Sequence, residues 1–380
     1  MPRKYEEIYQ IYKQKILSRE LNPTDRLPSE RKLAKDFGHS RITAKRALNE
    51  LEKEGFIERI QGSGSYVTKN KWKKDGFLEN TNGNLSIISL VLPFHDEFSS
   101  QILKGIEDVA KRKNFFVTFH DSKASPRIEK NVIEDIILKG AHGIILYPTQ
   151  PFDNMELYSQ LLIKKYPIVL IDRKIPGLEM PLVTVDNEQS FYNITDYLIK
   201  CGHKKIVFVA PEVRSVSSEY DRYRGFCKAH IDNNVSLMNK HLYSIEDIDD
   251  MSDDYRPNEP LDDRAAHFFF DIFENMKPEE KPTAIAAVND LTAERIMAIA
   301  IKRDIKIPET FSVTGFDNLS FTSHLPVPLT TVSQPALKIG KTAASILFDL
   351  IASPDNGNDF HKINAKLIKR DSCAPPPKGT

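Results

Sequence analysis

Three side chains that can recognise nucleic acid stand close together at Arg41, Thr43 and Lys45. The apolar residues around them recur at the spacing of one helix face, at Ala44, Ala47, Leu48 and Leu51. The three polar side chains therefore project from other sides of the first helical turns. Arginine, threonine and lysine at the start of a helix reach base edges and phosphates in the major groove of DNA. This stretch predicts a recognition helix.

The elements around this helix fit an N-terminal winged helix-turn-helix. Three predicted helices and a hairpin occupy residues 4–19, 29–37, 40–51 and 56–67. Ser29 and Ser40 are the expected N-caps of the second and third helices, and Gly38 ends the second. The hairpin tip, Gln61 to Gly64, has no bulky side chain and can lie close to a phosphate backbone.

Residues 4–68 resemble the GntR-type winged helix. The resemblance rests on motifs that follow one another in the family order: Leu27-Pro28-Ser29-Glu30-Arg31, Phe37-Gly38, Ser40-Arg41, Ala47-Leu48, Leu51, Glu54-Gly55 and Gly62-Ser63-Gly64. It implies DNA contacts by Lys4, Arg31, Ser40, Arg41, Thr43, Lys45, Gln61, Gly62, Ser63 and Gly64. His39, Ala44 and Lys45 depart from the commoner family pattern, which bears on the operator sequence and not on whether DNA is bound.

The rest of the chain alternates between strands and helices. Short apolar strands are predicted at residues 87–92, 115–119, 143–147, 168–171, 205–209, 284–288 and 312–316, and amphipathic helices at 98–113, 127–139, 188–201 and 290–303. This alternation predicts an α/β fold of doubly wound parallel sheets, which bind ligands at the carboxyl ends of their strands. The segment is too long for one ordinary sheet, so two lobes are expected.

Polar and aromatic residues that follow the predicted strands are the candidate ligand-binding residues: Phe94, His95, Asp121, Tyr147, Asp172, Arg173, Asn289, Asp290 and Asp317. Carboxylates and an arginine make directional hydrogen bonds to hydroxyl groups, and aromatic faces cover the apolar side of a sugar ring. Each residue has a simpler interpretation. Asp290 can cap the next helix, Asp172 and Asp317 can stabilise turns, and His95 can be a solvated loop residue.

This second part resembles the LacI-type sensor, which is related to periplasmic sugar-binding proteins. The matching segments include Gly143-Ile144-Ile145, residues 167–173, Gly202-His203-Lys204-Lys205-Ile206, Arg222-Tyr223-Arg224-Gly225-Phe226, Asn289-Asp290, Gly315-Phe316-Asp317 and residues 328–332. The resemblance implies a two-lobed sensor of periplasmic-binding-protein type I, in which Arg222 and Asp290 are the strongest ligand contacts.

The combination of the two parts resembles the arabinose-responsive repressors of Gram-positive bacteria. It implies a transcriptional repressor controlled by a small carbohydrate, with arabinose or another pentose as the leading candidate. A corepressor-dependent regulator that responds to a purine is the alternative. Two recognition helices related by a two-fold axis also predict a homodimer on double-stranded, roughly palindromic operator DNA.

Charge is divided unevenly along the chain. Residues 1–74 hold 18 lysines and arginines against 10 aspartates and glutamates, a net charge of +8, and the remainder carries −8. A basic end on an acidic body fits a nucleic-acid-binding module joined to a domain with another task. The expected domains are residues 1–68 for DNA binding, a polar linker at 69–84, and residues 85–380 for ligand binding and dimerisation.

Several other classes of protein are not expected. The sequence has no apolar run long enough to span a membrane, no signal peptide, and only three cysteines, which favours a reduced, cytoplasmic setting. It lacks the common hydrolase, nucleotide-binding and metalloprotease motifs, so neither an enzyme nor a cofactor is expected. Residues 246–263 hold nine acidic residues without a calcium-loop pattern, and we expect a solvated insertion there.

Overall fold

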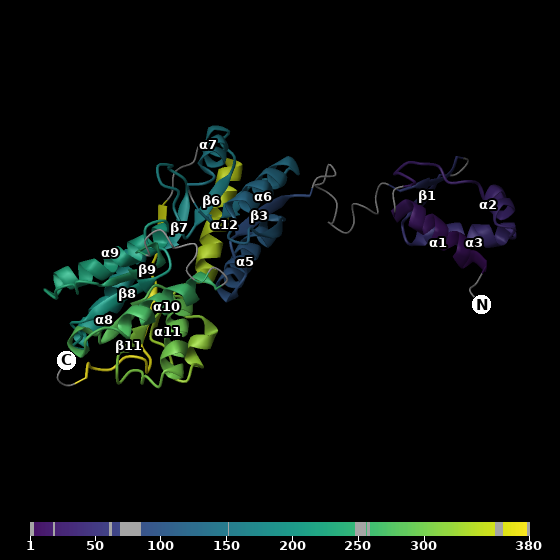
Figure 1. Cartoon of the computed structure of the whole chain (residues 1–380). Coiled ribbons are helices and arrows are strands. Elements are labelled where there is room, and N and C mark those ends of the chain that lie inside the picture. Colours follow the sequence, from purple (N-terminus) through teal and green to yellow (C-terminus); the bar gives the residue numbers. More distant parts are fainter. Residues whose placement is uncertain are drawn as a thin grey trace. The chain divides into compact units, whose positions relative to one another are not determined.

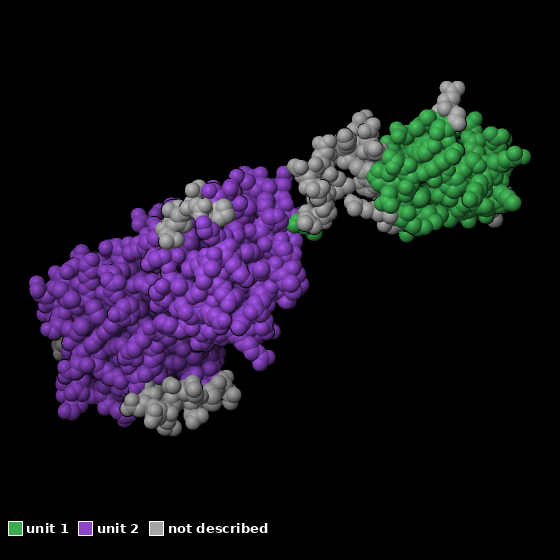
Figure 2. Space-filling model, turned by 90° about the horizontal axis from the view of Figure 1, so that it is seen from above, with its two compact units in different colours: residues 1–85 green, residues 86–380 purple. Residues whose placement is uncertain are grey.

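The computed structural model describes residues 4–17, 20–60, 63–68, 85–150, 152–247, 256, 259–353 and 360–377. The contacts divide the chain into two units, Met1–Leu85 and Ser86–Thr380, which are coloured separately in Figure 2. The linker expected at residues 69–84 lies outside the described residues. Within the described part, no helix is both long and apolar enough to cross a bilayer.

The first unit consists of three helices and a hairpin. They are α1 (Lys4–Leu17), α2 (Glu30–Asp36), α3 (Arg41–Lys53), β1 (Ile57–Ile60) and β2 (Gly64–Val67), and the two strands pair antiparallel (Figure 1). The N-caps predicted for α2 and α3 are confirmed, since Ser29 accepts a hydrogen bond from the Lys32 amide and Ser40 from the Thr43 amide. The predicted apolar face of α3 is buried against α1 and α2.

The second unit begins with a lobe built on a six-stranded parallel sheet. Its strands lie in the order β13 (Phe360–Ile363), β7 (Leu182–Val185), β6 (Ile168–Ile171), β5 (Ile144–Leu146), β3 (Ile87–Leu92), β4 (Phe116–Asp121). One face packs against α5 (Glu97–Ala110) and α12 (Ala336–Ala352), the other against α6 (Pro126–Leu138) and α7 (Met155–Ile163) (Figure 1). Side chains alternate between these two helical layers along each strand. We call this the first lobe.

The second lobe contains a four-stranded parallel sheet. Its strands lie in the order β11 (Ser312–Thr314), β10 (Ala284–Ala287), β8 (Ile206–Ala210), β9 (Leu242–Ser244). Helices α8 (Asn187–Lys200) and α9 (Ser217–Asp232) cover one face, and α10 (Leu261–Phe273) and α11 (Asp290–Lys302) cover the other. Both sheets are therefore doubly wound, as the alternating pattern predicts.

The chain passes between the lobes three times. It crosses from β7 to α8, from β12 (Thr331–Ser333) to α12, and from β13 to β14 (Lys366–Ile368). Strands β12 and β14 pair antiparallel, and both contact α8 of the second lobe. Each lobe is thus completed by a segment from the far end of the sequence, which holds the two sheets next to each other.

Candidate functional site

Helix α3, the predicted recognition helix, presents a polar face opposite its buried stripe. Arg41, Ile42 and Lys45 are exposed, and the Arg41 side chain keeps 74% of its surface. Ser40 and Thr43 lie against each other at the helix start, with their hydroxyl oxygens 2.9 Å apart. The exposed Ile42 is an apolar residue among polar ones, a type of side chain that contacts thymine methyl groups. The sequence analysis did not single it out.

An ion-pair network orients the exposed arginine of this face. The Nε atom of Arg41 lies 3.2 Å from Glu30 Oε2, and Glu30 Oε1 lies 3.6 Å from Arg59 Nη1. Glu30 therefore joins α2, α3 and β1. Arg31, the next residue on α2, is exposed, in keeping with a contact to DNA.

A basic residue that precedes α2 contacts the hairpin tip. Arg26 Nη2 donates to the Ser63 carbonyl at 2.5 Å, and Gly64 holds a φ of +133° where an added Cβ would meet the Arg26 guanidinium. Arg26 was missed because an isolated loop arginine leaves no periodic signal. Gln61 and Gly62 lie outside the described residues, as does the side chain of Lys4, which begins α1.

In the first lobe, four of the predicted ligand-binding residues meet. Tyr147 follows β5 and donates its hydroxyl hydrogen to Asp172 Oδ2 at 2.8 Å. The guanidinium of Arg173 lies 5.0 Å from the centre of the Tyr147 ring, and the Phe94 ring meets that ring edge-on at 5.3 Å. Asp172 holds a φ of 62°, a left-handed conformation that is uncommon for non-glycine residues and recurs at binding sites.

Two other strand-end residues of this lobe lie apart from that group. His95 is exposed, and its ring packs against Phe119 at 5.2 Å. Asp121 accepts a hydrogen bond from the Lys123 amide at 2.7 Å and so stabilises a turn.

In the second lobe, Arg222 and Asp317 are the corresponding polar residues. Arg222 is buried on α9, where its Nε atom donates to Asn187 Oδ1 at 2.9 Å and its guanidinium lies 3.9 Å from the Phe316 ring centre. Asp317 accepts a hydrogen bond from Gln334 Nε2 at 2.6 Å and holds a φ of 127°. Burial raises the pKa of Asp317 well above its usual range, and the charge of Arg222 opposes that rise.

Asp290 is engaged within the protein. Its two carboxylate oxygens accept hydrogen bonds from the Thr331 hydroxyl at 2.5 Å and the Leu319 amide at 2.9 Å, and the residue is fully buried. Burial raises the pKa of Asp290 to about 6. The helix cap that the sequence allowed for Asp290 belongs to Asn289, whose Oδ1 accepts from the Thr292 amide. This geometry favours a structural role for Asp290.

Charged and polar residues of the two lobes lie near one another. The charge of Arg222 opposes the rise in the pKa of Tyr147, and the charge of Asp172 adds to the rise in the pKa of Asp317. Strand ends of both sheets therefore converge. Two hydrogen bonds also cross between the lobes, from the Lys174 amide to Ser217 Oγ at 3.0 Å and from the Ser320 amide to Glu97 Oε2 at 2.8 Å.

Glu219 on α9 also belongs to this group, although it was not predicted. It lies near Arg173 of the first lobe and Arg222 of the second. It follows no strand, so its position carries no signal of the kind that identified the others. We call six residues the interlobe cluster: Tyr147, Asp172, Arg173, Glu219, Arg222 and Asp317.

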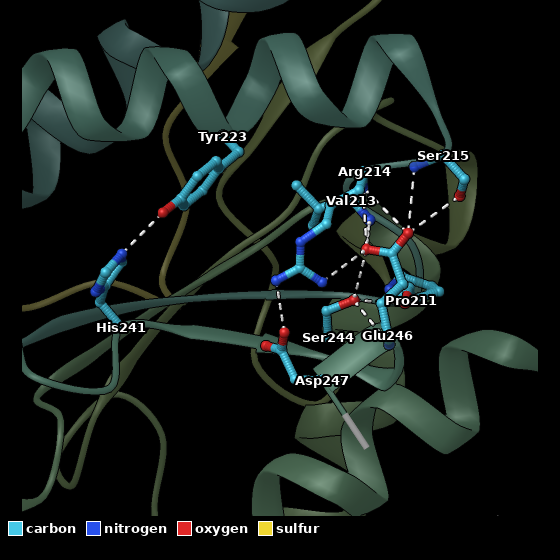
Figure 3. A network of polar contacts seen from close by, with 9 residues as sticks. All are labelled: Pro211, Val213, Arg214, Ser215, Tyr223, His241, Ser244, Glu246 and Asp247. Carbon is cyan, nitrogen blue, oxygen red and sulfur yellow. Dashed lines mark hydrogen bonds and ion pairs between the residues drawn. The ribbon is translucent and has the colours of Figure 1, made fainter. Parts of the chain in front are cut away.

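The start of α9 is fixed by the acidic segment (Figure 3). Glu246 accepts hydrogen bonds from the amides of Val213 and Arg214, both at 2.9 Å, and from the Ser215 hydroxyl at 3.2 Å. Arg214 Nη2 also lies 2.6 Å from Asp247 Oδ1. The prediction of a solvated insertion at residues 246–263 is therefore wrong for its first two residues. Their carboxylates bind the loop between β8 and α9.

The far end of that segment is also bound, since Asp262 Oδ1 accepts a hydrogen bond from the Thr292 hydroxyl at 2.5 Å. Burial raises the pKa of Asp262. Residues 248–255, 257 and 258 lie outside the described part of the chain.

Comparison with known proteins separates the chain into the same two parts. The family described as bacterial regulatory proteins, gntR family, matches residues 4–67. The family described as periplasmic binding protein-like domain matches residues 195–373.

Two of the relatives align over nearly the whole chain, and a third aligns over about three quarters of it. A protein of Geobacillus stearothermophilus named arabinose metabolism transcriptional repressor is 29% identical over 92% of this chain and 91% of its own length. A protein of the same name from Halalkalibacterium halodurans is 26% identical over 98% of this chain and 97% of its own. The HTH-type transcriptional repressor CytR of Escherichia coli is 27% identical over 77% of this chain and 80% of its own length.

Solved structures share the fold of the second unit. A LacI family transcriptional regulator from Enterococcus faecium with bound ribose aligns with a TM-score of 0.63 and 21% identity, over 76% of this chain and 99% of its own. A structure named transcriptional regulator CelR-cellobiose complex aligns with a TM-score of 0.65 and 18% identity, over 88% of this chain and 90% of its own. The chain therefore joins a segment that matches the gntR family of bacterial regulatory proteins to a segment that matches the periplasmic binding protein-like domain, and the relatives named above are transcription regulators.

Proposed function

We propose that this protein is a transcriptional repressor whose affinity for operator DNA falls when a neutral monosaccharide binds between the lobes of its sensor. The observation that carries the proposal is the convergence of Tyr147, Asp172 and Arg173 with Arg222 and Asp317 across two sheets, in a chain that also has a DNA-binding domain. Two relatives named for arabinose metabolism make arabinose or another pentose the leading candidate.

The chemistry of the interlobe cluster supports a neutral polyol. Its three carboxylates accept hydrogen bonds from hydroxyl groups, its two arginines donate to hydroxyl and ring oxygens, and Phe94 and Phe316 add aromatic surface beside them. The proposed ligand contacts are Phe94, Tyr147, Asp172, Arg173, Arg222, Asn289 and Asp317. His95 and Asp290, which were also predicted, are not placed among these contacts.

DNA binding is assigned to the exposed face of α3, the start of α2 and the hairpin tip. The proposed contacts with DNA come from Arg31, Ser40, Arg41, Thr43, Lys45, Ser63 and Gly64, together with Lys4, Gln61 and Gly62. A homodimer places two such faces on the half-sites of a palindromic operator. Because its target is DNA, we assign the protein to the bacterial cytoplasm.

The proposed mechanism couples closure of the lobes to the spacing of the two DNA-binding domains. A ligand that contacts both lobes stabilises one arrangement of the sensor over another, and it acts on DNA binding only through that difference. A coupling free energy of about 1–3 kcal/mol changes operator affinity about 5–150-fold. By linkage, operator DNA then weakens sugar binding by the same factor.

Titration of sugars into a preformed operator complex tests the proposal. The operator is the promoter fragment next to the protein's own gene, labelled for fluorescence anisotropy, and the panel contains L-arabinose, D-ribose, D-xylose, D-glucose and cellobiose. We expect one pentose to release the DNA. Tighter DNA binding on addition of a sugar would replace the inducer mechanism with a corepressor mechanism. If none of the sugars that the protein binds changes its affinity for operator DNA, the allosteric part of the proposal is wrong.

A further inference from the structure

Three buried polar atoms near the interlobe cluster have no hydrogen-bond partner among the residues that the structure describes. They are Glu219 Oε2, Arg173 Nε and Gln334 Oε1. They come from three separate places: helix α9, the segment after β6 and the crossover before α12. Buried polar atoms are nearly always paired, so such a group of unpaired atoms indicates a site that another molecule completes.

Glu219 lies at the meeting point of these elements. It stands three residues before Arg222 on α9, so the two side chains lie on neighbouring parts of one helix face. The charges that reach its carboxylate come from Arg173 in the first lobe, and from Arg222, Asp262 and Glu212 in the second. Ser217, two residues earlier, accepts the hydrogen bond from the Lys174 amide that joins the lobes. Glu219 therefore faces both lobes at their point of contact.

The backbone at the start of the helix that carries Glu219 is held in place by Glu246. The carboxylate of Glu246 binds the amides of Val213, Arg214 and Ser215, which immediately precede α9 (Figure 3). The helix start cannot shift without breaking this set of bonds. A carboxylate presented from a fixed helix turn, with one oxygen unpaired, is suited to select a hydrogen-bond donor at one position.

We propose that Glu219 is a specificity-determining residue of the effector site, where its carboxylate accepts a hydrogen bond from one hydroxyl group of the sugar at the junction of the lobes. The inference rests on the proposed function and adds a residue that follows no strand end. Burial raises the pKa of Glu219 to about 8, with Arg173 and Arg222 opposing the rise, which is consistent with a carboxylate that lacks its partner. A site built to bind a hydroxyl rejects the analogue that lacks it, because the protein group is then left buried and unpaired.

Calorimetry on the full-length protein tests this assignment. Wild type and Glu219→Gln are titrated with L-arabinose, D-ribose, D-xylose, D-glucose and cellobiose. The matched control is Asp232→Asn, which makes the same change from acid to amide at the exposed end of the same helix. We expect Glu219→Gln to weaken binding of the tightest wild-type sugar by about tenfold, because the amide does not reproduce the hydrogen bond of the carboxyl group and leaves a buried polar group unpaired. The control keeps wild-type affinity, and all three proteins keep the same operator affinity without sugar, which shows that they are folded.

Deoxy analogues of the tightest sugar distinguish direct contact from a structural effect. Removal of the hydroxyl that Glu219 binds should weaken wild type strongly and Glu219→Gln only slightly, whereas removal of any other hydroxyl should weaken both proteins equally. Equal losses for every analogue, or wild-type affinity in Glu219→Gln, overturn the role of Glu219 and leave the sugar proposal standing. A wild-type protein that binds none of the five sugars overturns the sugar proposal itself and this inference with it.

Discussion

At the scale of single residues, Asp172 and Asp317 show how the backbone prepares the proposed ligand site. Each follows a strand end and holds a positive φ, 62° and 127° respectively. Conformations of this kind cost on the order of 1–3 kcal/mol and persist where the surrounding structure fixes them. Here Tyr147 bonds to Asp172 and Gln334 to Asp317, so each carboxylate is fixed by a neighbour as well as by its own backbone.

Glu219 gives the clearest pH dependence. Its pKa is raised from 4.5 to about 8, chiefly by burial, so the folded protein binds a proton here that the unfolded chain releases across this range. The contribution of Glu219 to stability therefore falls as pH rises from about 4.5 to about 8. We expect Glu219→Gln to gain stability relative to wild type between pH 5 and pH 8, by on the order of 3 kcal/mol.

Thermal unfolding of the sensor, followed in both proteins at several pH values, measures that change. The comparison uses the difference between the proteins, because Asp290 and Asp317 also have raised pKa values and act equally in both. A difference that stays constant from pH 5 to pH 8 would show that Glu219 has an ordinary pKa in the folded state.

Arg41 is the residue whose loss should most affect operator recognition. Its exposed guanidinium is oriented by Glu30 at the start of the recognition helix. We expect Arg41→Ala to lower operator affinity by about 1–3 kcal/mol, the usual value of a base contact by arginine. Anisotropy with the operator and with a scrambled duplex measures the effect.

Lys53→Ala is the control for Arg41→Ala. Lys53 is exposed at the far end of α3, so this variant loses the same charge away from the groove. Equal losses for both variants, on both duplexes, would indicate that Arg41 contributes charge alone.

At the scale of elements, glycines let pairs of helices approach closely. Gly105 of α5 and Gly340 of α12 face each other, and a Cβ added at Gly340 would lie 2.1 Å from the Ile102 carbonyl oxygen. On the second lobe, a Cβ at Gly225 of α9 would lie 2.1 Å from the Glu188 carbonyl oxygen of α8. Both contacts are with backbone, which cannot move aside as a flexible side chain can. These close approaches set the positions of α12 and α9 on their sheets.

Gly340→Ala should therefore destabilise the first lobe. Alanine gains about 1 kcal/mol of helix propensity over glycine. The steric conflict at 2.1 Å separates α5 from α12, and we expect a net loss of about 1–3 kcal/mol in the free energy of unfolding. Urea denaturation of the full chain measures it. Ser345→Ala on the exposed side of the same helix should stay within about 0.5 kcal/mol of wild type, and a similar result for Gly340→Ala would refute the close packing.

At the scale of the whole molecule, the N-terminal end and the rest of the chain carry net charges of opposite sign. Residues 1–74, with a net charge of +8, lie within the first unit, and the acidic remainder of the chain contains the sensor. An acidic sensor keeps phosphates away from its own ligand site and leaves DNA to the basic unit. The two binding reactions should consequently respond to salt in different ways.

Operator affinity should fall steeply as salt rises. If the two DNA-binding domains of a dimer neutralise about 6–10 phosphates, affinity drops about 10³–10⁵-fold between 50 and 200 mM salt because counterions are released from DNA. The affinity for a neutral sugar, measured by calorimetry over the same range, should stay nearly constant. Operator binding that is insensitive to salt would contradict DNA binding through the basic face of this unit.

Much of the fold follows from the sequence by itself. Two serine N-caps and a buried alanine–leucine stripe predict α2 and α3, and the apolar runs at Ile87–Leu92 and Ile168–Ile171 coincide with β3 and β6. These features are local, because a cap or a periodic face needs only a few neighbouring residues. The short strands β7, β9, β12, β13 and β14 were not predicted as strands. Each of them holds three or four residues with at least one polar residue among them, unlike the unbroken apolar run of β6, and pairing with distant strands determines them.

Only the tertiary structure decided which polar residues belong to the candidate site. Asp290 and Asp317 look alike in sequence, since both follow a strand of the second lobe. The first is enclosed by Thr331 and Leu319, whereas the second is directed toward Arg222 and the other lobe. From the sequence alone, Glu219 is an ordinary surface carboxylate of a helix, and Glu246 is one of a run of acidic residues. Each has a partner far away in the chain: Ser215 lies 31 residues from Glu246, and Arg173 lies 46 residues from Glu219. Burial and pairing across such separations arise from packing, which no local pattern of residues encodes.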